Sequence, residues 1–495
     1  MSSSSSSPIF LGLDLGTQSV RAMAVSATGE MLGLGVQPLT SRRDGPRHEQ
    51  EPDEWWHATA AACRAALADL PRERICGVAV DATSGTILLI DDAGRALTTG
   101  LMYDDARAVN ESKRATEGGA STWAALGYQR MQATWGLPKL LWLRRERPEL
   151  FTTTTRLAHQ SDFINRRLAG EPVATDSSNA LKTGCDPRIE DWPREIFAAL
   201  DVPPEVLPPV VRSGARLGSV CAAVAAETSI PEGTAIFAGM TDGCAAQIGA
   251  GALSVGSWNS VLGTTLVLKG VAPTLLKDPL GVVYSHRSPD GHWLPGGASS
   301  VGAGVLAQQF PGRDLDALSA QAAESGPANA IAYPLAGHGE RFPFHAPDAE
   351  GFLLGKPRDQ LDHYAALLQG VAFIERLCFA HLERIGAPTD GDLLLTGGGA
   401  KSCAWCQLRA DILGHSVKIP ENAEAAFGMA ILAAAEGRSI ADTAASMVRI
   451  RETLDPQPER TRQFAEPYQR LVTEFVRRGW LASDPTLTGC QIPLC

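Results

Sequence analysis

The chain has 495 residues, of which 44% are apolar and 20% charged, and its formal net charge is −11. This length suffices for two to three domains with substantial cores. The acidic balance argues against a nucleic-acid-binding surface or an anionic-membrane binder. It still allows a phosphorylated ligand, for which one local basic or Mg²⁺ site is enough.

The N-terminal segment holds the serines Ser2 to Ser7 but lacks the basic and apolar stretches of a signal peptide. We expect residues 1–8 to be a disordered leader. No run of about 18 apolar residues occurs, so no membrane span is expected. The ten cysteines are scattered, as buried thiols of a reducing compartment would be. Cys403 and Cys406 form a lone CxxC without a second pair, which disfavours a metal or redox role. A cytoplasmic location follows from this composition.

The first predicted element is a hairpin over residues 9–25. An apolar run reaches Asp14, a Gly16-Thr17 pair follows, and a second alternating run ends at Val25. Gly16 lets backbone N–H groups approach an anion, Thr17 adds a hydroxyl, and Asp14 can hold a hydrated Mg²⁺. A plain hairpin with Asp and Thr as turn formers explains the same residues.

A helix is predicted from Pro52-Asp53, with Asp53 as its cap and Pro71 ending it. Strands are predicted at 75–80 and 86–90, helices at 137–143 and 161–168, and a strand at 235–238. Strands and helices that alternate with glycine turns indicate a mixed sheet flanked by helices. A domain boundary is expected in the glycine-rich stretch that follows Ala238.

A second hairpin follows at 257–269 and contains Leu262-Gly263-Thr264, the tripeptide that the first hairpin has at Leu15-Gly16-Thr17. Two such hairpins that face each other would bind a polyphosphate from both sides. The layout resembles the sugar kinase, Hsp70 and actin superfamily, whose two duplicated domains hold ATP in the cleft between them.

The last third predicts a helix through 364–378, a strand at 393–396, and Gly397-Gly398-Gly399. Helices at 402–413 and 423–435 flank a strand at 416–419. A strand, a triple glycine and a helix favour nucleotide binding, because bare backbone lets a ring and ribose approach closely, although such loops also serve plain turns. Residues 451–482 are expected to form a helical segment that packs back, and 483–495 a loose tail.

Taken together, the motifs resemble the FGGY carbohydrate kinases over nearly the whole chain. The matching pieces, in chain order, are Gly12-Leu-Asp14-Leu-Gly-Thr17, Gly239-Met-Thr-Asp242-Gly243, Leu262-Gly-Thr-Thr265, Pro295-Gly-Gly-Ala298, Thr396-Gly-Gly-Gly-Ala-Lys-Ser402, Trp405-Cys-Gln407-Leu-Arg-Ala-Asp411-Ile-Leu-Gly414 and Glu424-Ala-Ala-Phe-Gly428. The resemblance implies an α/β fold of two ribonuclease-H-like domains, 9–244 and 245–450, with the active site in the cleft between them.

The resemblance also implies site residues. Asp242 matches the catalytic base, which takes the proton from the attacking sugar hydroxyl, although an Asp-Gly turn is the plain alternative. Asp14 would hold Mg²⁺ through water and lie at the substrate. The residues implied for ATP are Thr17, Arg21, Gly263, Thr264, Gly398, Gly399 and Ser402.

On the sugar side, the resemblance points to Asp81, Ser84, Tyr103, Asp104 and Arg107. Xylulokinases carry a Gly-Gln-Met-His-Gly type sequence where this chain has Thr83-Ser84-Gly85-Thr86, and a Trp where it has Tyr103. The stretches around Ser84 and Asp242 look most like the D-ribulose kinases of plants and cyanobacteria. We therefore expect D-ribulose, phosphorylated at O5, with Ser84 as a sugar ligand.

The expected activity is an ATP- and Mg²⁺-dependent kinase whose partners are a small sugar and ATP, with no nucleic acid and no membrane; a homo-oligomer is possible. D-xylulose or a broad range of pentuloses and polyols is the alternative substrate class. An ATP-driven chaperone or filament protein would need a further module. A catalytically inert sugar sensor is disfavoured because Asp14, Asp242 and both Gly-Thr pairs are present.

Overall fold

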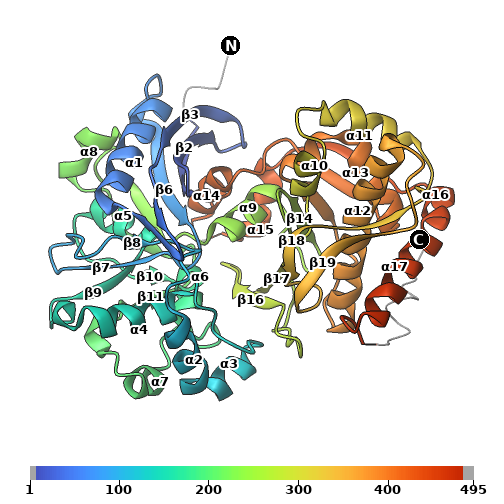
Figure 1. Ribbon diagram of the computed structural model, residues 1–495. Helices are drawn as coiled ribbons and strands as arrows, with labels where there is room; N and C mark the ends of the chain where they lie inside the picture. The colour runs from blue at the N-terminus through green and yellow to red at the C-terminus, as the bar shows by residue number, and fades with distance from the viewer. Residues whose placement is uncertain (1–6, 437, 483–495) are drawn as a thin grey trace, which may run out of the picture. The chain divides into compact units, whose positions relative to one another are not determined.

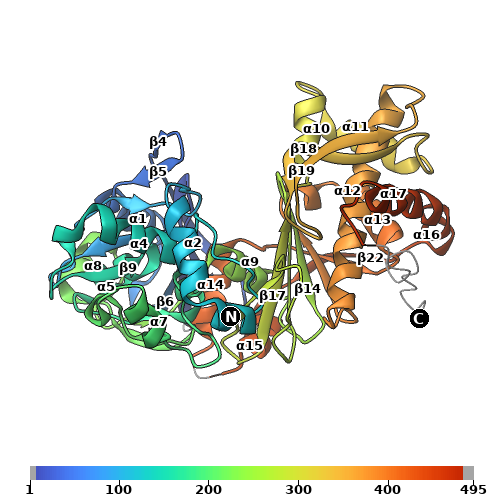
Figure 2. The ribbon, with the colours of Figure 1, turned by 60° about the horizontal axis from the view of Figure 1, so that its bottom comes forward.

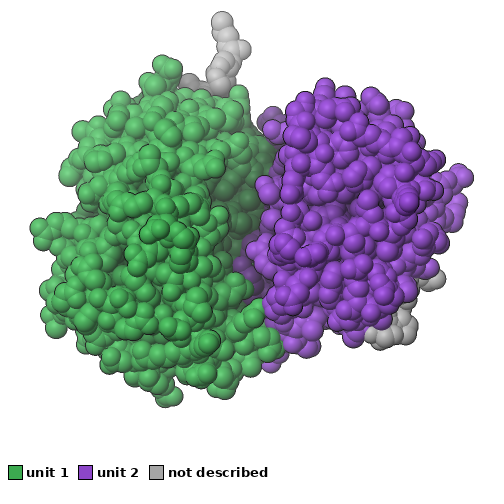
Figure 3. All heavy atoms as spheres, viewed as in Figure 1, with its two compact units in different colours: residues 1–251, 286–294, 422–448 green, residues 252–285, 295–421, 449–495 purple. Residues whose placement is uncertain are grey.

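The computed structural model describes residues 7–436 and 438–482, which form two compact units. Unit 1 comprises residues 1–251, 286–294 and 422–448, and unit 2 comprises 252–285, 295–421 and 449–495 (Figure 3). The expected leader at 1–8, except for residues 7 and 8, and the expected tail at 483–495 lie outside the described residues.

Unit 1 is built on a six-stranded sheet in the order β12-β13-β6-β1-β2-β3 (Figure 1). Its strands are β1 (Ile9–Leu15), β2 (Ser19–Ser26), β3 (Met31–Pro38), β6 (Ile75–Ala82), β12 (Arg216–Ser219) and β13 (Ala235–Phe237). Strands β1, β2 and β3 run antiparallel in succession, β6 is parallel to β1 and to β13, and β12 is antiparallel to β13. The predicted first hairpin is thus confirmed.

Unit 2 repeats this topology in a seven-stranded sheet ordered β16-β17-β15-β14-β20-β21-β22. Its strands are β14 (Trp258–Leu262), β15 (Leu266–Gly270), β16 (Tyr284–Arg287), β17 (Trp293–Ser299), β20 (Leu393–Thr396), β21 (Val417–Pro420) and β22 (Ile450–Leu454). Here β14 is antiparallel to β15 and parallel to β20, β20 is parallel to β21, and β22 is antiparallel to β21. The matching sequence of directions confirms the expected duplicated α/β fold.

Helices α1 (Pro52–Ala66) and α14 (Ala425–Ala434) cover opposite faces of the unit 1 sheet. A Cβ at Gly35 would lie 2.0 Å from the Ala62 carbonyl oxygen on α1, and one at Gly12 would lie 1.7 Å from that of Ala426 on α14. Both glycines are required by close helix packing. The residue before α1 is Glu51, with Pro52 at its first position and no side-chain cap, so the predicted cap at Asp53 is wrong.

The rest of unit 1 holds a five-stranded sheet, a two-stranded sheet and shorter helices. Their bounds are β4 (Arg42–Asp44), β5 (Arg47–Gln50), β7 (Ile87–Ile90), β8 (Gly100–Leu101), β9 (Arg156–His159), β10 (Thr175–Asp176), β11 (Val210–Val211), α2 (Val109–Gly118), α3 (Ala120–Ala125), α4 (Gly136–Glu146), α5 (Gln160–Ala169), α6 (Ser177–Ala180), α7 (Arg194–Ala199), α8 (Ala222–Thr228), α9 (Asp242–Ala250) and α15 (Ile440–Met447).

In unit 2, α12 (Gln360–Arg384) and α13 (Cys403–Leu413) run along one face of the sheet (Figure 2). The other elements are α10 (Gly304–Gln309), α11 (Leu315–Glu324), β18 (Ile331–Glu340), β19 (Ala346–Leu354), α16 (Pro458–Gln463) and α17 (Ala465–Arg477). Helix α12 is long and apolar enough for a membrane span by length and composition, but 94% of its apolar window is buried, as in a core helix.

The division into units differs from the predicted segments, because residues 245–251, 286–294 and 422–448 of the predicted second domain belong to unit 1. Residues 422–448, with α14 and α15, pack with unit 1 although they follow most of unit 2 in the chain. Helix α14 packs closely against two elements of unit 1: a Cβ at Gly428 would lie 1.9 Å from the Ala245 carbonyl oxygen on α9, and Gly12 of β1 lies against Ala426.

Candidate active site

Three carboxylates meet at one edge of the unit 1 sheet. Asp14 near the end of β1 lies opposite Asp81 of β6 in the parallel register. Asp242 opens α9, and the residue before it, Thr241, forms a parallel bridge with Ala82, next to Asp81. Carboxyl ends of parallel strands share one sheet edge, so the fold itself gathers these side chains.

The three carboxylates repel one another. Burial, followed by the charge of Asp242, raises the pKa of Asp14. Burial, followed by the charges of Asp14 and Asp242, raises the pKa of Asp81 well above its usual range. Both Asp81 oxygens are buried and receive no donor from the described residues. Buried like charges without donors are costly, and such clusters are typical of functional sites.

The predicted phosphate residues of the first hairpin lie beside this cluster. Arg21 contacts Asp14 at 3.3 Å (Nη1 to Oδ2) and lies 3.9 Å from Glu424. The Gly16 amide donates to the Ser19 carbonyl oxygen at 3.1 Å, so it serves the turn itself. The Thr17 carbonyl oxygen accepts from Gln50 Nε2 at 2.7 Å, which fixes the orientation of the turn.

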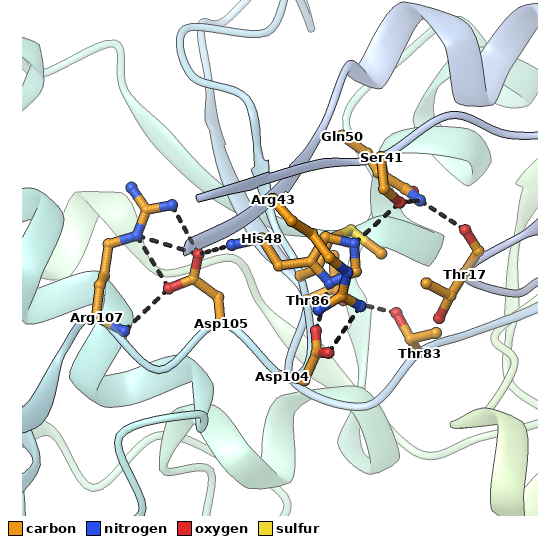
Figure 4. Close-up of polar contacts among 12 residues, drawn as sticks. Thr17, Ser41, Arg43, His48, Gln50, Thr83, Thr86, Asp104, Asp105 and Arg107 are labelled. Carbon is orange, nitrogen blue, oxygen red and sulfur yellow. Dashed lines mark hydrogen bonds and ion pairs between the residues drawn. The ribbon is translucent and has the colours of Figure 1, made fainter. Parts of the chain in front are cut away.

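A polar chain links that turn to the predicted sugar segment (Figure 4). Gln50 Nε2 also donates to Ser41 Oγ at 2.8 Å, and Ser41 Oγ lies 2.9 Å from His48 Nε2. His48 is buried, and its Nδ1 lies 2.5 Å from Asp104, which Arg43 also contacts.

Tyr103 and Arg107, also predicted on the sugar side, are arranged differently from Asp104, and the neighbouring Asp105 is the reason for Arg107. Asp105 is fully buried and bound by Arg107 and by the His48 amide. Arg107 is therefore occupied by carboxylates, whereas the side chain of Tyr103 is partly exposed.

The turn that carries Ser84 joins β6 to β7. Ser84 Oγ is buried and has no partner among the described residues, while the Ser84 and Gly85 carbonyl oxygens accept from Lys182 at 3.5 Å and Lys139 at 2.9 Å. Lys139 also donates to the Met102 carbonyl oxygen at 2.5 Å. Burial lowers the pKa of this fully buried lysine to about 7.

The three glycines after β20 differ in whether the fold requires a glycine at their position. Gly397 has φ of +79°, and a Cβ at Gly399 would lie 2.5 Å from the Leu262 side chain, so the fold itself requires both. Gly398 has ordinary φ, is exposed, and a Cβ there would meet nothing within 4 Å. Gly398 is therefore the glycine whose identity the fold leaves unexplained and a close ligand would explain.

The second hairpin turn is held by its own neighbours. The Gly263 amide donates to the Thr265 carbonyl oxygen at 3.0 Å, and the Gly263 and Thr264 carbonyl oxygens accept from the amides of Ala303 and Gly304. The Thr264 side chain remains a candidate phosphate donor. Ser402 caps α13 by accepting from the Trp405 amide, and its hydroxyl hydrogen stays available to a ligand.

Sequence reasoning missed Lys139 and His48, which hold the segments around the site. Lys139 falls on the apolar face of α4 with Leu140 and Leu143, and a lysine at such a position is the sequence signal that could have indicated its burial. Of the CxxC residues, Cys403 is exposed and Cys406 buried, and both are free thiols. The described residues contain no group of three His, Cys, Asp or Glu side chains that could hold a metal ion.

Comparison with known proteins agrees with this architecture. The N-terminal domain model of the FGGY family of carbohydrate kinases matches residues 9–249, and the C-terminal domain model matches 258–436. A xylulose kinase of Bacillus subtilis is 27% identical over 86% of this chain and 87% of its own length, and one of Streptomyces coelicolor is 30% identical over 90% and 91%. A crystal structure of a xyloylose kinase from Brucella ovis has a TM-score of 0.87 at 25% identity, covering 95% of this chain and 99% of that one.

These family matches span most of both units and include the duplicated hairpins and the carboxylate edge. The chain belongs to the FGGY family of carbohydrate kinases, which are phosphotransferases with an alcohol acceptor.

Proposed function

We propose that this protein is an ATP-dependent kinase that phosphorylates the terminal hydroxyl of a pentulose. The observation that carries the proposal is the cluster of Asp14, Asp81 and Asp242 at the sheet edge, where burial and mutual repulsion raise the pKa of Asp14 and of Asp81. A proton-accepting group and a cation-binding group are both needed for phosphoryl transfer to an alcohol, and carboxylates supply both.

Asp242 acts as the general base in this proposal. It accepts the proton of the sugar hydroxyl as that oxygen attacks the γ-phosphorus of ATP and ADP leaves. Its carboxylate is held in place because Oδ1 accepts from the Gly243 amide at 2.7 Å. Its place at the first residue of α9 stabilises the ionised form, since a helix N-terminus carries partial positive charge.

Asp14, with Asp81 beside it, fits a hydrated Mg²⁺. Mg²⁺ prefers oxygen ligands and usually binds through one or two carboxylates plus water and substrate phosphates. When bound, the ion would neutralise charge on the transferring phosphoryl group. A cation here would also offset the repulsion that raises the pKa of both carboxyl groups.

The nucleotide is assigned to the glycine turns. Gly398 offers open backbone to the adenosine, with Gly399 and Ser402 following it. Thr264, with Gly263, is assigned to phosphate in unit 2, and Thr17 and Arg21 are assigned to phosphate in unit 1. These assignments rest on the open backbone at Gly398, on the hydroxyl groups of Thr264 and Ser402, and on the place of Arg21 beside the carboxylate cluster.

The sugar is assigned as D-ribulose, phosphorylated at O5. Support comes from Ser84, whose buried hydroxyl has no partner within residues 7–436 and 438–482, at the position where xylulokinases carry a Met-His pair. A site that hydrogen-bonds one hydroxyl can reject an epimer strongly, because its polar groups are otherwise left unpaired. The relatives named xylulose kinases make D-xylulose the alternative substrate.

ADP release with a panel of sugars tests the proposal. We expect kcat/KM to be highest for D-ribulose, and Ser84→Ala to weaken D-ribulose use selectively. A preference for D-xylulose, or no preference, would show that the substrate assignment is wrong. An unchanged ratio in the variant would remove Ser84 from the site, and absence of ADP release with every sugar would favour the inert sensor.

A further inference from the structure

Residues 286–294, which run from the end of β16 to the start of β17, belong to unit 1 and are anchored there at two points. His286 is buried, and its Nδ1 lies 3.1 Å from Ser178 Oγ of α6. Four residues further on, the Asp290 carboxylate accepts from Ser439 Oγ at 3.0 Å and from the Ile440 amide at 2.9 Å, at the start of α15. Asp290 caps the N-terminus of α15, whereas His286 contacts a residue that is itself bonded to the segment before Asp242.

Ser178 connects His286 to the residue before Asp242. The Thr241 amide donates to Ser178 Oγ at 3.2 Å, and Thr241 Oγ1 lies 3.4 Å from the same oxygen. His286, Ser178 and Thr241 are each at most 1% exposed. Thr241 is the N-cap residue of α9 and makes no side-chain cap of its own. The hydroxyl of Ser178 therefore fixes the backbone at the point where α9 and Asp242 begin.

Hydrogen-bond directions give His286 a specific part in this arrangement. Ser178 Oγ accepts the Thr241 N–H, so its own hydrogen can be donated to Nδ1 of a neutral His286. That donation orients the hydroxyl so that a lone pair faces the Thr241 amide. A side chain without an acceptor at the Nδ1 position would leave the Ser178 hydroxyl free to rotate.

We propose that His286, acting through Ser178 and Thr241, is a positioning residue for Asp242. The inference rests on the proposed function of Asp242 as the base. A base must lie within hydrogen-bond reach of the proton that it takes, and small misplacements cost large factors in rate. His286 contacts neither substrate in this scheme and acts only on the orientation of the carboxylate.

Two isosteric variants separate this role from a general structural one. In His286→Asn the amide oxygen can take the place of Nδ1, so kcat should stay within about threefold of wild type. In His286→Gln the polar end reaches the Nε2 position instead, and kcat should fall about tenfold with KM for ATP and for the sugar nearly unchanged. Ser178→Ala should match His286→Gln. Equal kcat in the Asn and Gln variants would overturn the proposal.

Asp290→Asn is the matched control, because it weakens the other anchor of the same segment without touching His286. It should lower the melting temperature and leave kcat nearly unchanged. A fall in kcat equal to that of His286→Gln would mean that displacement of the whole segment, not His286, is responsible.

A double variant tests the route through the base. If His286 acts through Asp242, His286→Gln should cause no further loss of kcat in the Asp242→Asn background. An additional tenfold loss would overturn the proposal. Near-normal kcat in Asp242→Asn alone would instead refute the base assignment on which the inference rests, so the two failures are distinguishable.

Discussion

The two Leu-Gly-Thr hairpins occupy equivalent places in the two sheets, but the residues beside them are charged in unit 1 and uncharged in unit 2. In unit 1, Asp14 lies opposite Asp81 across parallel strands, and neither pairs fully with a cation. At the equivalent places of unit 2, Val261 lies opposite Thr396, which donates to Asn259. The two units share the turn and the strand pairing, while at this one pair of positions unit 1 has two carboxylates and unit 2 has Val261 and Thr396.

Unit 2 does bury charges, but it pairs them. Arg409 and Glu375 are fully buried, with two 2.7 Å contacts between guanidinium and carboxylate, and Ser260 bonds both. This buried pair, joined by two contacts, serves the core, although Arg409 Nη1 has no partner among the described residues. A buried cluster of like charges is instead typical of a functional site. The difference separates a structural polar group from a functional one on similar scaffolds.

Removing one half of the unit 2 pair should give the largest effect on stability. We expect Arg409→Met to cost about 3–5 kcal/mol, because it leaves the Glu375 carboxylate buried without its cation. Chemical denaturation measures this cost. The double variant Arg409→Met with Glu375→Leu is the control and should recover most of the loss; a loss as large as in the single variant would mean that packing, not charge, dominates.

Removing a charge from the unit 1 cluster should instead stabilise the folded protein. We expect Asp81→Asn to stabilise the fold by roughly 1–2 kcal/mol, since the site is strained by repulsion, and to lower kcat. Thermal unfolding in the absence of Mg²⁺ tests this expectation. Asp105→Asn is the matched control: Asp105 is as buried but bound by Arg107, so that variant should be destabilised. Destabilisation by Asp81→Asn as well would contradict the distinction.

The glycines of unit 2 can be sorted in the same way. Gly398→Ala should raise KM for ATP by about tenfold without lowering the melting temperature, because only a ligand would meet the new methyl group. Gly397→Ala should destabilise the protein, because the residue sits at φ of +79°. ATP titration and thermal unfolding of both variants provide the comparison. An unchanged KM for ATP in Gly398→Ala would show that the nucleotide does not bind at Gly398.

A smaller effect concerns pH. Burial raises the pKa of Asp176 from 3.8 to about 6 in the folded protein. The folded state therefore binds this proton more tightly than the unfolded chain, so the contribution to stability is full below about pH 4 and is lost as pH rises to about 6. The melting temperature should therefore fall by a few degrees between about pH 4 and pH 6. In Asp176→Asn, which can still cap α6, this part of the decline should disappear.

Much of this architecture could be predicted from local pattern. Both hairpins, α12, β20 and α13 follow from hydrophobic period and glycine position, and Asp14, Asp242 and Gly398 follow from motifs within a few residues. The cap at Asp53 failed because Pro52 already begins the helix. Local pattern could not place α14 in unit 1, since that depends on the contact of Gly428 with Ala245.

The residues that hold the segments around the site could not be predicted from the sequence for the same reason. His48, Lys139 and His286 act through partners 37 to 108 positions away in the chain. Each is isolated in sequence and belongs to no short motif. Only the three-dimensional register of the strands brings them to the segments that they hold.

The proposed phosphoryl transfer depends most on Asp242, the unit 1 carboxylate at the start of α9. The direct measurement is the rate of sugar phosphate formation in Asp242→Asn, together with ATP affinity in the same preparation. We predict a fall in kcat of about 100-fold or more, because general-base assistance is typically worth that much, with ATP affinity nearly intact. Near-normal turnover in the variant would contradict the account.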